Sequence, residues 1–254
     1  MPALDALTAT PRAAAAAVCF LTRIPLGRWL VLGPDDVARG AAFFPIIGAG
    51  IGALAGLVAT SLDSRLSAML AAALAVALDA LLTGAIHLDG LADTADGLGA
   101  RSRERALEIM REPTIGAFGA IAIGVDLLLK TTAIAAIAGG SHPVLALTAV
   151  FALGRAGPVA LAWALPYARP SGGSGLALTG AAAAWPAIGL AIAVGGTVAL
   201  LGVRGLWLLL GAALGTALIG IIAWWRLGGV TGDVLGSAVE TATVFALLAA
   251  ALSR

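Results

Sequence analysis

The chain has 254 residues, of which 60% are hydrophobic and 11% are charged, and its formal net charge at neutral pH is +1. Soluble domains are typically about 25% charged, so this composition excludes an ordinary soluble domain and indicates a protein embedded in lipid. The near-zero net charge gives no electrostatic attraction for nucleic acid, and we expect no such partner.

Seven stretches are long and apolar enough to cross a membrane, since a spanning helix needs about 20 mostly apolar residues. The shorter stretch at residues 12–21 predicts an interfacial helix. We therefore expect an all-α fold, a polytopic membrane helix bundle with about seven transmembrane helices plus a short N-terminal interfacial helix. The whole chain, residues 1–254, forms one integral membrane domain. The seven stretches are residues 41–61, 66–88, 115–138, 144–165, 181–201, 205–225 and 234–252.

The arginines that flank these stretches are shared unevenly between the two sides of the membrane. Because cytoplasmic loops carry an excess of Lys and Arg, the richer side is predicted to be cytoplasmic. The long polar connections, residues 22–40, 89–114, 166–180 and 226–233, fall on this same side, where we expect the active site. The richer side receives Arg12, Arg23, Arg28, Arg39, Arg101, Arg103, Arg105, Arg111, Arg169 and Arg226, and the other receives Arg65, Arg204 and Arg254.

An acidic motif follows the second stretch. It contains Asp89, Asp93 and Asp96 and no Lys, Arg or Glu between residues 87 and 97. On a helix the three carboxylates lie within about 60° of one another and repel unless a cation lies among them. Such oxygen ligands suit Mg²⁺, which then bridges phosphate oxygens. The motif predicts a Mg²⁺ site, the alternative being a solvated helix end.

The catalytic candidates in this motif are Asp93, Asp96 and His87. On a continuous helix His87 lies about 160° from the centre of the carboxylate face. It can serve as a base at the metal only if the helix bends near Gly90. Otherwise it is a hydrogen-bonded histidine at the membrane interface.

Residues 100–113 predict a short, arginine-rich helix that ends at Pro113. Guanidinium groups match phosphate oxygens, but a helix of this kind can also lie along anionic lipid headgroups. Arg101 and Arg111 are candidate phosphate contacts, and so is Arg169 in a loop rich in glycine and serine.

Several charged residues lie inside the predicted spans. Asp126 and Lys130 are one helical turn apart and are expected to pair. Arg155 and Asp79 either pair across helices or line the site, where Arg155 would contact substrate phosphate.

The last polar loop precedes the final span. Gly228, Gly229, Thr231 and Gly232 are expected to offer backbone N–H groups to an anion at the start of that helix. Asp233 is either a further metal ligand or the helix cap.

These segments together resemble the cobalamin synthase family, the membrane adenosylcobinamide-GDP ribazoletransferases. The resemblance implies transfer of the adenosylcobinamide phosphate moiety from adenosylcobinamide-GDP to α-ribazole or its 5′-phosphate. GMP leaves, and adenosylcobalamin or its 5′-phosphate forms. It also implies Mg²⁺ as cofactor and a place in the bacterial cytoplasmic (inner) membrane. The matching segments are residues 20–25, 39–45, 87–97, 100–116, 118–119, 154–155, 167–169 and 228–236, with Glu240.

Two other functions fit part of the pattern. A CDP-alcohol phosphotransferase of lipid synthesis has a similar membrane metal site, but Asp93 stands where that family's pattern has an arginine. A cation-coupled transporter would use ionisable residues within the spans, whereas here the polar groups collect at one interface. The lipid bilayer is an expected partner, and the sequence leaves the oligomeric state open, a homo-oligomer included.

Overall fold

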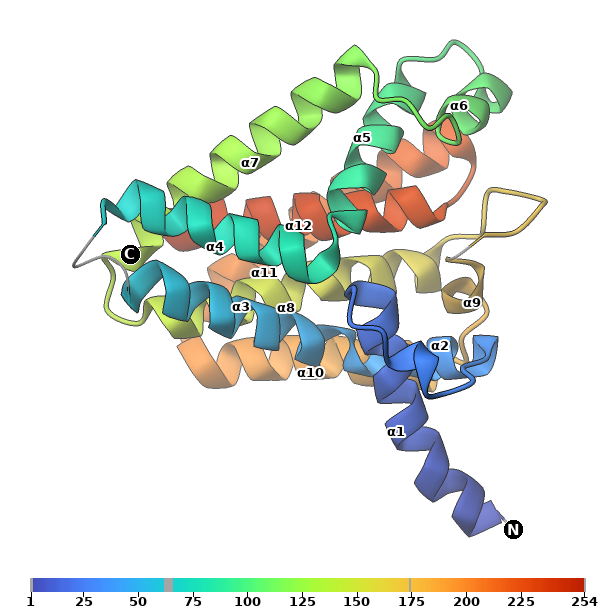
Figure 1. The fold of residues 1–254 in the computed structure, drawn as a ribbon, viewed down its shortest axis with the longest axis horizontal. Helices are drawn as coiled ribbons and strands as arrows, with labels where there is room; N and C mark the ends of the chain where they lie inside the picture. Colours follow the sequence, from blue (N-terminus) through green and yellow to red (C-terminus); the bar gives the residue numbers. More distant parts are fainter. Residues whose placement is uncertain (1, 62–65, 174, 254) are drawn as a thin grey trace.

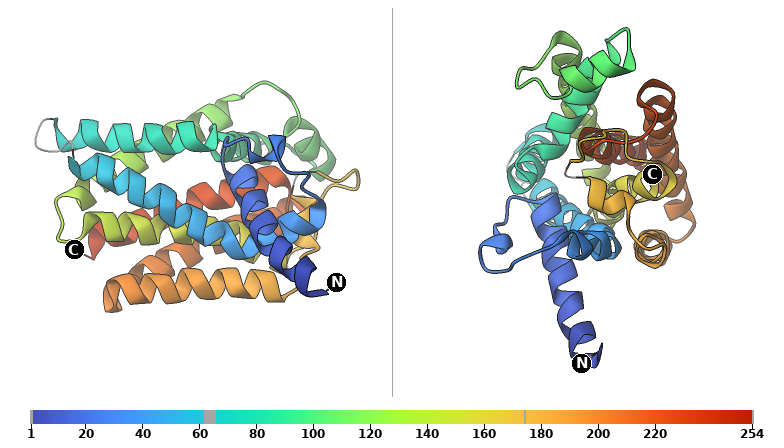
Figure 2. Two further views of the ribbon diagram at one scale, coloured as in Figure 1. Left: turned by 60° about the horizontal axis from the view of Figure 1, so that its bottom comes forward. Right: turned by 90° about the vertical axis from the view of Figure 1, so that its right-hand side faces the viewer.

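The computed structural model describes residues 2–61, 66–173 and 175–253, which form a bundle of helices (Figure 1). The long helices follow the longest axis of the molecule, and several short elements gather at one end (Figures 1 and 2). The elements are α1 (Pro2–Leu21), η1 (Leu26–Arg28), α2 (Pro34–Gly40), η2 (Ala41–Phe43), α3 (Phe44–Ser61), α4 (Ala68–Thr83), α5 (Ile86–Leu98), α6 (Arg103–Ile109), α7 (Ala117–Ala138), α8 (Pro143–Ala164), α9 (Leu176–Thr179), α10 (Ala184–Leu201), α11 (Val203–Leu227) and α12 (Gly232–Leu252).

Six helical segments of the described chain are long and apolar enough to cross a membrane, and a seventh span results if α4 and α5 are counted together. The expected polytopic bundle of about seven membrane helices is confirmed. α8 and α12 form its centre, since 72% of each span is buried. The six segments are Pro34–Ser61, Ala117–Ala138, Pro143–Ala164, Ala184–Leu201, Val203–Leu227 and Gly232–Leu252.

The second predicted span is not one straight helix. α4 ends at Thr83, and α5 leaves it at an angle of 90°. Gly84 and Ala85 both adopt the left-handed backbone conformation, with φ of 62° and 57°, which stops one helix and redirects the chain. A side chain at position 84 would also collide with Arg23. α5 therefore lies across the end of the bundle, outside the spanning helices (Figure 1).

Glycines allow the spanning helices to touch. A Cβ atom at Gly48 or Gly52 of α3 would collide with the carbonyl oxygens of Phe151 or Leu147 of α8. Close approach of this kind provides the van der Waals contact that holds helices together in lipid. The glycine contacts thus run along the packed faces of α3 and α8.

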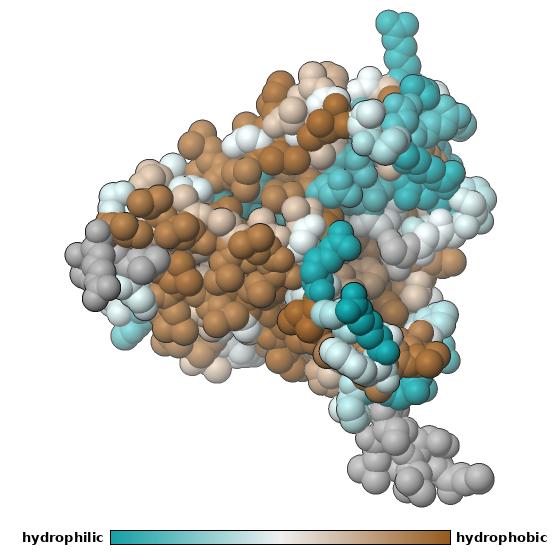
Figure 3. Space-filling view, in the orientation of Figure 1, coloured by the Kyte–Doolittle hydropathy of each residue, from teal (hydrophilic) through white to brown (hydrophobic). Residues whose placement is uncertain are grey.

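The surface divides into an apolar belt and a polar end. Hydrophobic residues cover the length of the bundle, and hydrophilic ones gather around α5 and α6 (Figure 3). Arg204 donates to Ser141 Oγ, at 3.4 Å, at the opposite end of the bundle. Arg65 and Arg254, predicted on that same side, lie outside the described residues.

Charged side chains buried among the spans form two ion-paired groups. Arg155 pairs with Asp79 across α8 and α4, at 2.6 Å. Lys130 pairs with Asp126, at 3.0 Å, and with Glu240 of α12. The predicted Asp126–Lys130 pair is confirmed. Because an unpaired charge in a bilayer is very costly, these pairs explain how the spans tolerate charge.

Candidate functional site

α5 crosses the N-terminal end of α12 with the two backbones in contact. A Cβ atom at Gly90 would lie 2.7 Å from the carbonyl oxygen of Asp233, and Gly236 faces α5 in a similar way. The glycine at position 90 is what allows so close a crossing, since a Cβ atom at Gly236 would come no nearer than 3.4 Å to α5. The crossing brings Asp89 and Asp93 near Asp233, which lies in the first turn of α12.

Asp93 is surrounded by other carboxylates. Partial burial has the largest effect on its carboxyl group, and the charges of Asp233, Asp89 and Asp96 add to it. Together they raise the pKa of Asp93 to about 7, although the positive charge of Arg169 opposes this. Like charges held in this way favour uptake of a proton or a cation.

Within the described residues, no three His, Cys, Asp or Glu side chains are already arranged to hold a metal ion. Mg²⁺ usually takes one or two carboxylates together with water and substrate phosphates, so a complete protein cage is not needed. The available donors are all carboxylate oxygens, which suit a hard divalent cation. Asp89, Asp93 and Asp233 are the side chains that fit this role.

Asp96 has a different local role from its two neighbours in the motif. Its carboxylate accepts hydrogen bonds from the backbone N–H groups of Gly116, at 2.7 Å, and Gly119, at 2.9 Å. These donors belong to the first turn of α7, where backbone N–H groups have no partner within the helix. Asp96 thus caps α7 and complements its dipole.

Asp233 forms an ion pair with Arg169, at 2.6 Å between Oδ2 and Nη2. The cap of α12 is Thr231, whose Oγ1 accepts from Val234 N at 3.2 Å. Of the two predicted roles for Asp233, the helix cap is therefore taken by another residue. The carboxylate of Asp233 is held instead beside the other aspartates by a positive partner.

His87 lies in the first turn of α5 and is buried. Its Nδ1 atom has no hydrogen-bond partner among the described residues. The bend near Gly90 that a catalytic role for His87 required is not present, because α5 is one continuous helix from Ile86 to Leu98 and the chain bends before it, at Gly84 and Ala85.

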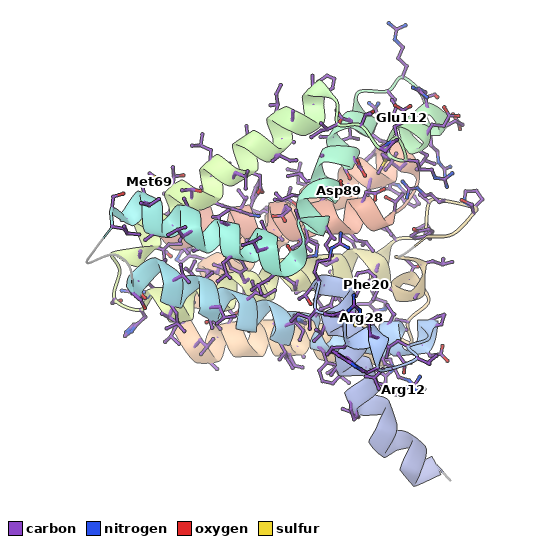
Figure 4. All side chains as sticks on the ribbon, viewed as in Figure 1. Arg12, Phe20, Arg28, Met69, Asp89 and Glu112 are labelled. Carbon is purple, nitrogen blue, oxygen red and sulfur yellow. The ribbon has the colours of Figure 1, made fainter. Side chains whose placement is uncertain are left out.

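Two hollows flank Asp89. The charged hollow, of about 430 Å³, is lined by Asp89, Ala92, Asp93, Met110, Arg111, Glu112, Pro113, Thr114, Ile115 and Ile123. The apolar hollow, of about 390 Å³, is lined by Cys19, Phe20, Leu21, Thr22, Arg23, Ile86, His87, Asp89, Pro158, Gly232, Asp233, Leu235, Gly236 and Val239. In Figure 4, Asp89 lies between Glu112 and Phe20, one from each hollow.

A larger cavity, of about 600 Å³, lies at the opposite end of the bundle and is lined by residues that include Gly139, His142 and Arg204. Among the described residues, no Asp or Glu lines it. It is larger than either hollow, but the clustered carboxylates are elsewhere, so we place the candidate site at α5.

The four predicted arginine contacts lie in four different environments. Arg111 lines the charged hollow and donates to Ser171 Oγ at 2.6 Å. Arg169 contacts Asp233, and Arg101 is exposed in the turn before α6. Arg155 is fully buried against Asp79 and lines neither hollow.

Part of the glycine loop before α12 uses its backbone N–H groups in hydrogen bonds to other segments of the protein. Gly228 N and Gly229 N donate to carbonyl oxygens of α11. Val230 N donates to Pro166 O at 2.9 Å. The N–H groups of Gly228 and Gly229 are therefore not available to an anion, contrary to the prediction. Gly232, by contrast, lines the apolar hollow.

Sequence reasoning assigned no role to Arg23 and Phe20, which line the apolar hollow. Arg23 N donates to Leu82 O, at 2.8 Å, which fixes this loop to the end of α4. The segment at residues 20–25 was part of the family resemblance, and that was the signal that could have pointed to both residues.

The chain was compared with known proteins. A family model described as cobalamin-5-phosphate synthase matches residues 13–251. An adenosylcobinamide-GDP ribazoletransferase of Chlorobium phaeovibrioides (strain DSM 265 / 1930) is 40% identical over 224 residues, or 86% of this chain and 90% of the relative. Proteins of the same name from Bradyrhizobium diazoefficiens and Citrobacter koseri are 39% and 37% identical, each over 92% of this chain and over 91% and 97% of their own. No solved structure matches. The chain therefore belongs to the cobalamin-5-phosphate synthase family.

Proposed function

We propose that this protein transfers the adenosylcobinamide phosphate moiety of adenosylcobinamide-GDP to α-ribazole or its 5′-phosphate. A ribose hydroxyl oxygen forms a bond with the cobinamide-side phosphorus, and the bond from that phosphorus to the oxygen of the departing GMP breaks. The products are GMP and a phosphodiester, and the hydroxyl proton must be accepted by a base.

The observation that carries this proposal is the meeting of Asp89, Asp93 and Asp233 between two hollows. A transfer reaction between two bound molecules needs two adjoining spaces and a shared centre where their reacting atoms meet. The names of the relatives supply the substrates, since each is a ribazoletransferase that acts with adenosylcobinamide-GDP.

A divalent cation, Mg²⁺ by preference, would be held by Asp89, Asp93 and Asp233 and would offset negative charge on the diphosphate. The surrounding residues position the substrate by charge. Arg111 faces the charged hollow, where its guanidinium can donate to phosphate oxygens. Arg169 holds Asp233 in place and so orients the acidic cluster.

A carboxylate of the acidic cluster or the imidazole of His87 accepts the hydroxyl proton, since these groups lie where the two hollows meet. His87 lines the apolar hollow, and we assign it a binding role there.

The distribution of arginines supports an orientation with α5 and α6 at the cytoplasmic face of the inner membrane. Arg226, for example, donates to the carbonyl oxygens of Leu98 and Ala100 at this end. Phosphorylated nucleotides are cytoplasmic metabolites, so this orientation gives them direct access. Labelling of Arg101→Cys, made in the Cys19→Ser background, by a membrane-impermeant maleimide in inverted vesicles tests this orientation. Labelling only in right-side-out vesicles would contradict it.

The experiment for the activity uses the purified full chain in detergent or nanodiscs. Adenosylcobinamide-GDP, α-ribazole and Mg²⁺ are supplied, and GMP release is followed together with the corrinoid product. Equal amounts of both products support the proposal. Phosphotransfer from a CDP-alcohol, or ion-dependent uptake into vesicles without GMP release, would favour the two alternatives instead.

A further inference from the structure

The two hollows beside Asp89 differ in their walls. The apolar hollow has side chains of Phe20, Leu21, Pro158, Leu235 and Val239 in its lining, which come from α1, α8 and α12, and it also has Arg23, Asp89 and Asp233. The charged hollow is lined by Asp93, Arg111 and Glu112 among others, and no aromatic side chain is among its described lining residues. The hollow with Phe20 therefore suits a ligand that joins an aromatic ring to a polar sugar, and the other suits a phosphorylated group.

The aromatic wall of the apolar hollow is held in place. The ring of Phe20 packs against that of Phe44, with centroids 5.4 Å apart. Phe44 is fully buried at the start of α3. A fixed ring of this kind presents a preformed surface to a flat ligand, so little freedom is lost on binding.

The apolar hollow also contains an unused polar atom. His87 is buried and lines this hollow, and its Nδ1 atom has no hydrogen-bond partner among the described residues. Buried polar atoms in native proteins are normally hydrogen-bonded, and those that are not often point to a missing ligand or water. Asp89 and Asp233 line the same hollow, so a ligand held there lies close to the carboxylates.

Building on the proposed function, we infer that the apolar hollow is the binding site for the acceptor nucleoside. The aromatic base of α-ribazole lies between Phe20 and the side chains of α12, and its ribose is directed to Asp89 and Asp233. His87 Nδ1 hydrogen-bonds to the nucleoside. The charged hollow takes the diphosphate of the donor, so the attacking hydroxyl and the phosphorus approach Asp89 from opposite sides.

The chain contains a natural reporter for this site. Cys19, its single cysteine, is half-buried and lines the apolar hollow. The purified full chain is treated with N-ethylmaleimide alone, with α-ribazole, or with GDP. The Cys19→Ser variant gives the background.

We expect α-ribazole to slow alkylation of Cys19 by about fivefold or more at saturation, and GDP to leave the rate unchanged. Protection by GDP alone, or no protection by either compound, would overturn the inference. The result is independent of turnover. Protection without GMP release would support the binding site and contradict the proposed reaction. GMP release without protection would support the reaction and contradict the binding site.

Kinetics give a second test. Loss of one aromatic wall in Phe20→Ala is expected to raise the KM for α-ribazole about fivefold and leave the KM for adenosylcobinamide-GDP unchanged. The matched variant Ile123→Ala shortens a side chain of the charged hollow and is expected to leave the KM for α-ribazole unchanged. A rise in the donor KM alone for Phe20→Ala would contradict the assignment.

Discussion

Gly90 of α5 lies directly against the carbonyl oxygen of Asp233 at the start of α12. This contact links the acidic motif in the first half of the chain to the last polar loop. Since a Cβ atom there would come within 2.7 Å of that oxygen, the backbones cannot approach as closely with any other residue at position 90.

Gly90→Ala is therefore expected to separate α5 from α12 and to reduce turnover strongly. Overpacking at such a contact also costs about 1–3 kcal/mol of stability. Activity and the thermal unfolding midpoint are measured on purified protein. Gly50→Ala is the matched control, because a Cβ atom at position 50 meets nothing within 4 Å. Equal activity of both variants would show that the crossing distance is unimportant.

The acidic cluster should bind divalent metal in a pH-dependent way. With a pKa of about 7, Asp93 is mostly protonated below neutral pH in the metal-free protein, and a metal ion must displace that proton. Affinity for Mn²⁺, measured by electron paramagnetic resonance, should rise about tenfold per pH unit from pH 5 to 7 and level off above it. Asp93→Asn should bind weakly and lose this dependence. An affinity that is the same at pH 6 and pH 8 would argue against metal binding at Asp93.

Asp96 is predicted to affect stability more than metal binding. Replacing it by alanine removes the acceptor of two backbone N–H groups of α7, and loss of a helix cap costs about 1 kcal/mol. Asp89→Ala removes no such bond and should reduce Mn²⁺ affinity instead. Unfolding midpoints and Mn²⁺ affinities of the two variants are compared. If Asp96→Ala loses metal but not stability, the capping role is wrong.

Arg155 is expected to be structural. Arg155→Leu leaves Asp79 buried without its partner, which typically costs about 3–5 kcal/mol. The double variant Asp79→Leu, Arg155→Leu removes both charges and should recover most of the stability and insertion. If the double variant recovered stability but still bound substrate poorly, Arg155 would be a phosphate contact and the structural role alone would be wrong.

Much of the fold could be predicted from the sequence because span length and apolar content are local properties. The bend between α4 and α5 could not, since it depends on Ala85 adopting a left-handed conformation that alanine seldom takes. The second predicted span, residues 66–88, therefore covers α4 but runs on past the bend into the start of α5.

The candidate site was predictable only in part. The spacing of Asp89 and Asp93 places them on one helical face, whatever the rest of the fold. Asp96, by contrast, accepts hydrogen bonds from the N-terminus of α7, and Asp233 pairs with Arg169. Such contacts between distant segments depend on tertiary packing, which spacing along the chain does not reveal.

The central claim is that the carboxylates at the crossing of α5 and α12 support metal-dependent release of GMP. The most direct test measures GMP release from adenosylcobinamide-GDP by the wild type and by Asp93→Asn, both purified and shown to be inserted and folded, with Mg²⁺ or with EDTA. We expect release by the wild type in Mg²⁺ only, and a rate lower by about a hundredfold or more for Asp93→Asn. Full activity of Asp93→Asn, or undiminished wild-type activity in EDTA, would contradict the account.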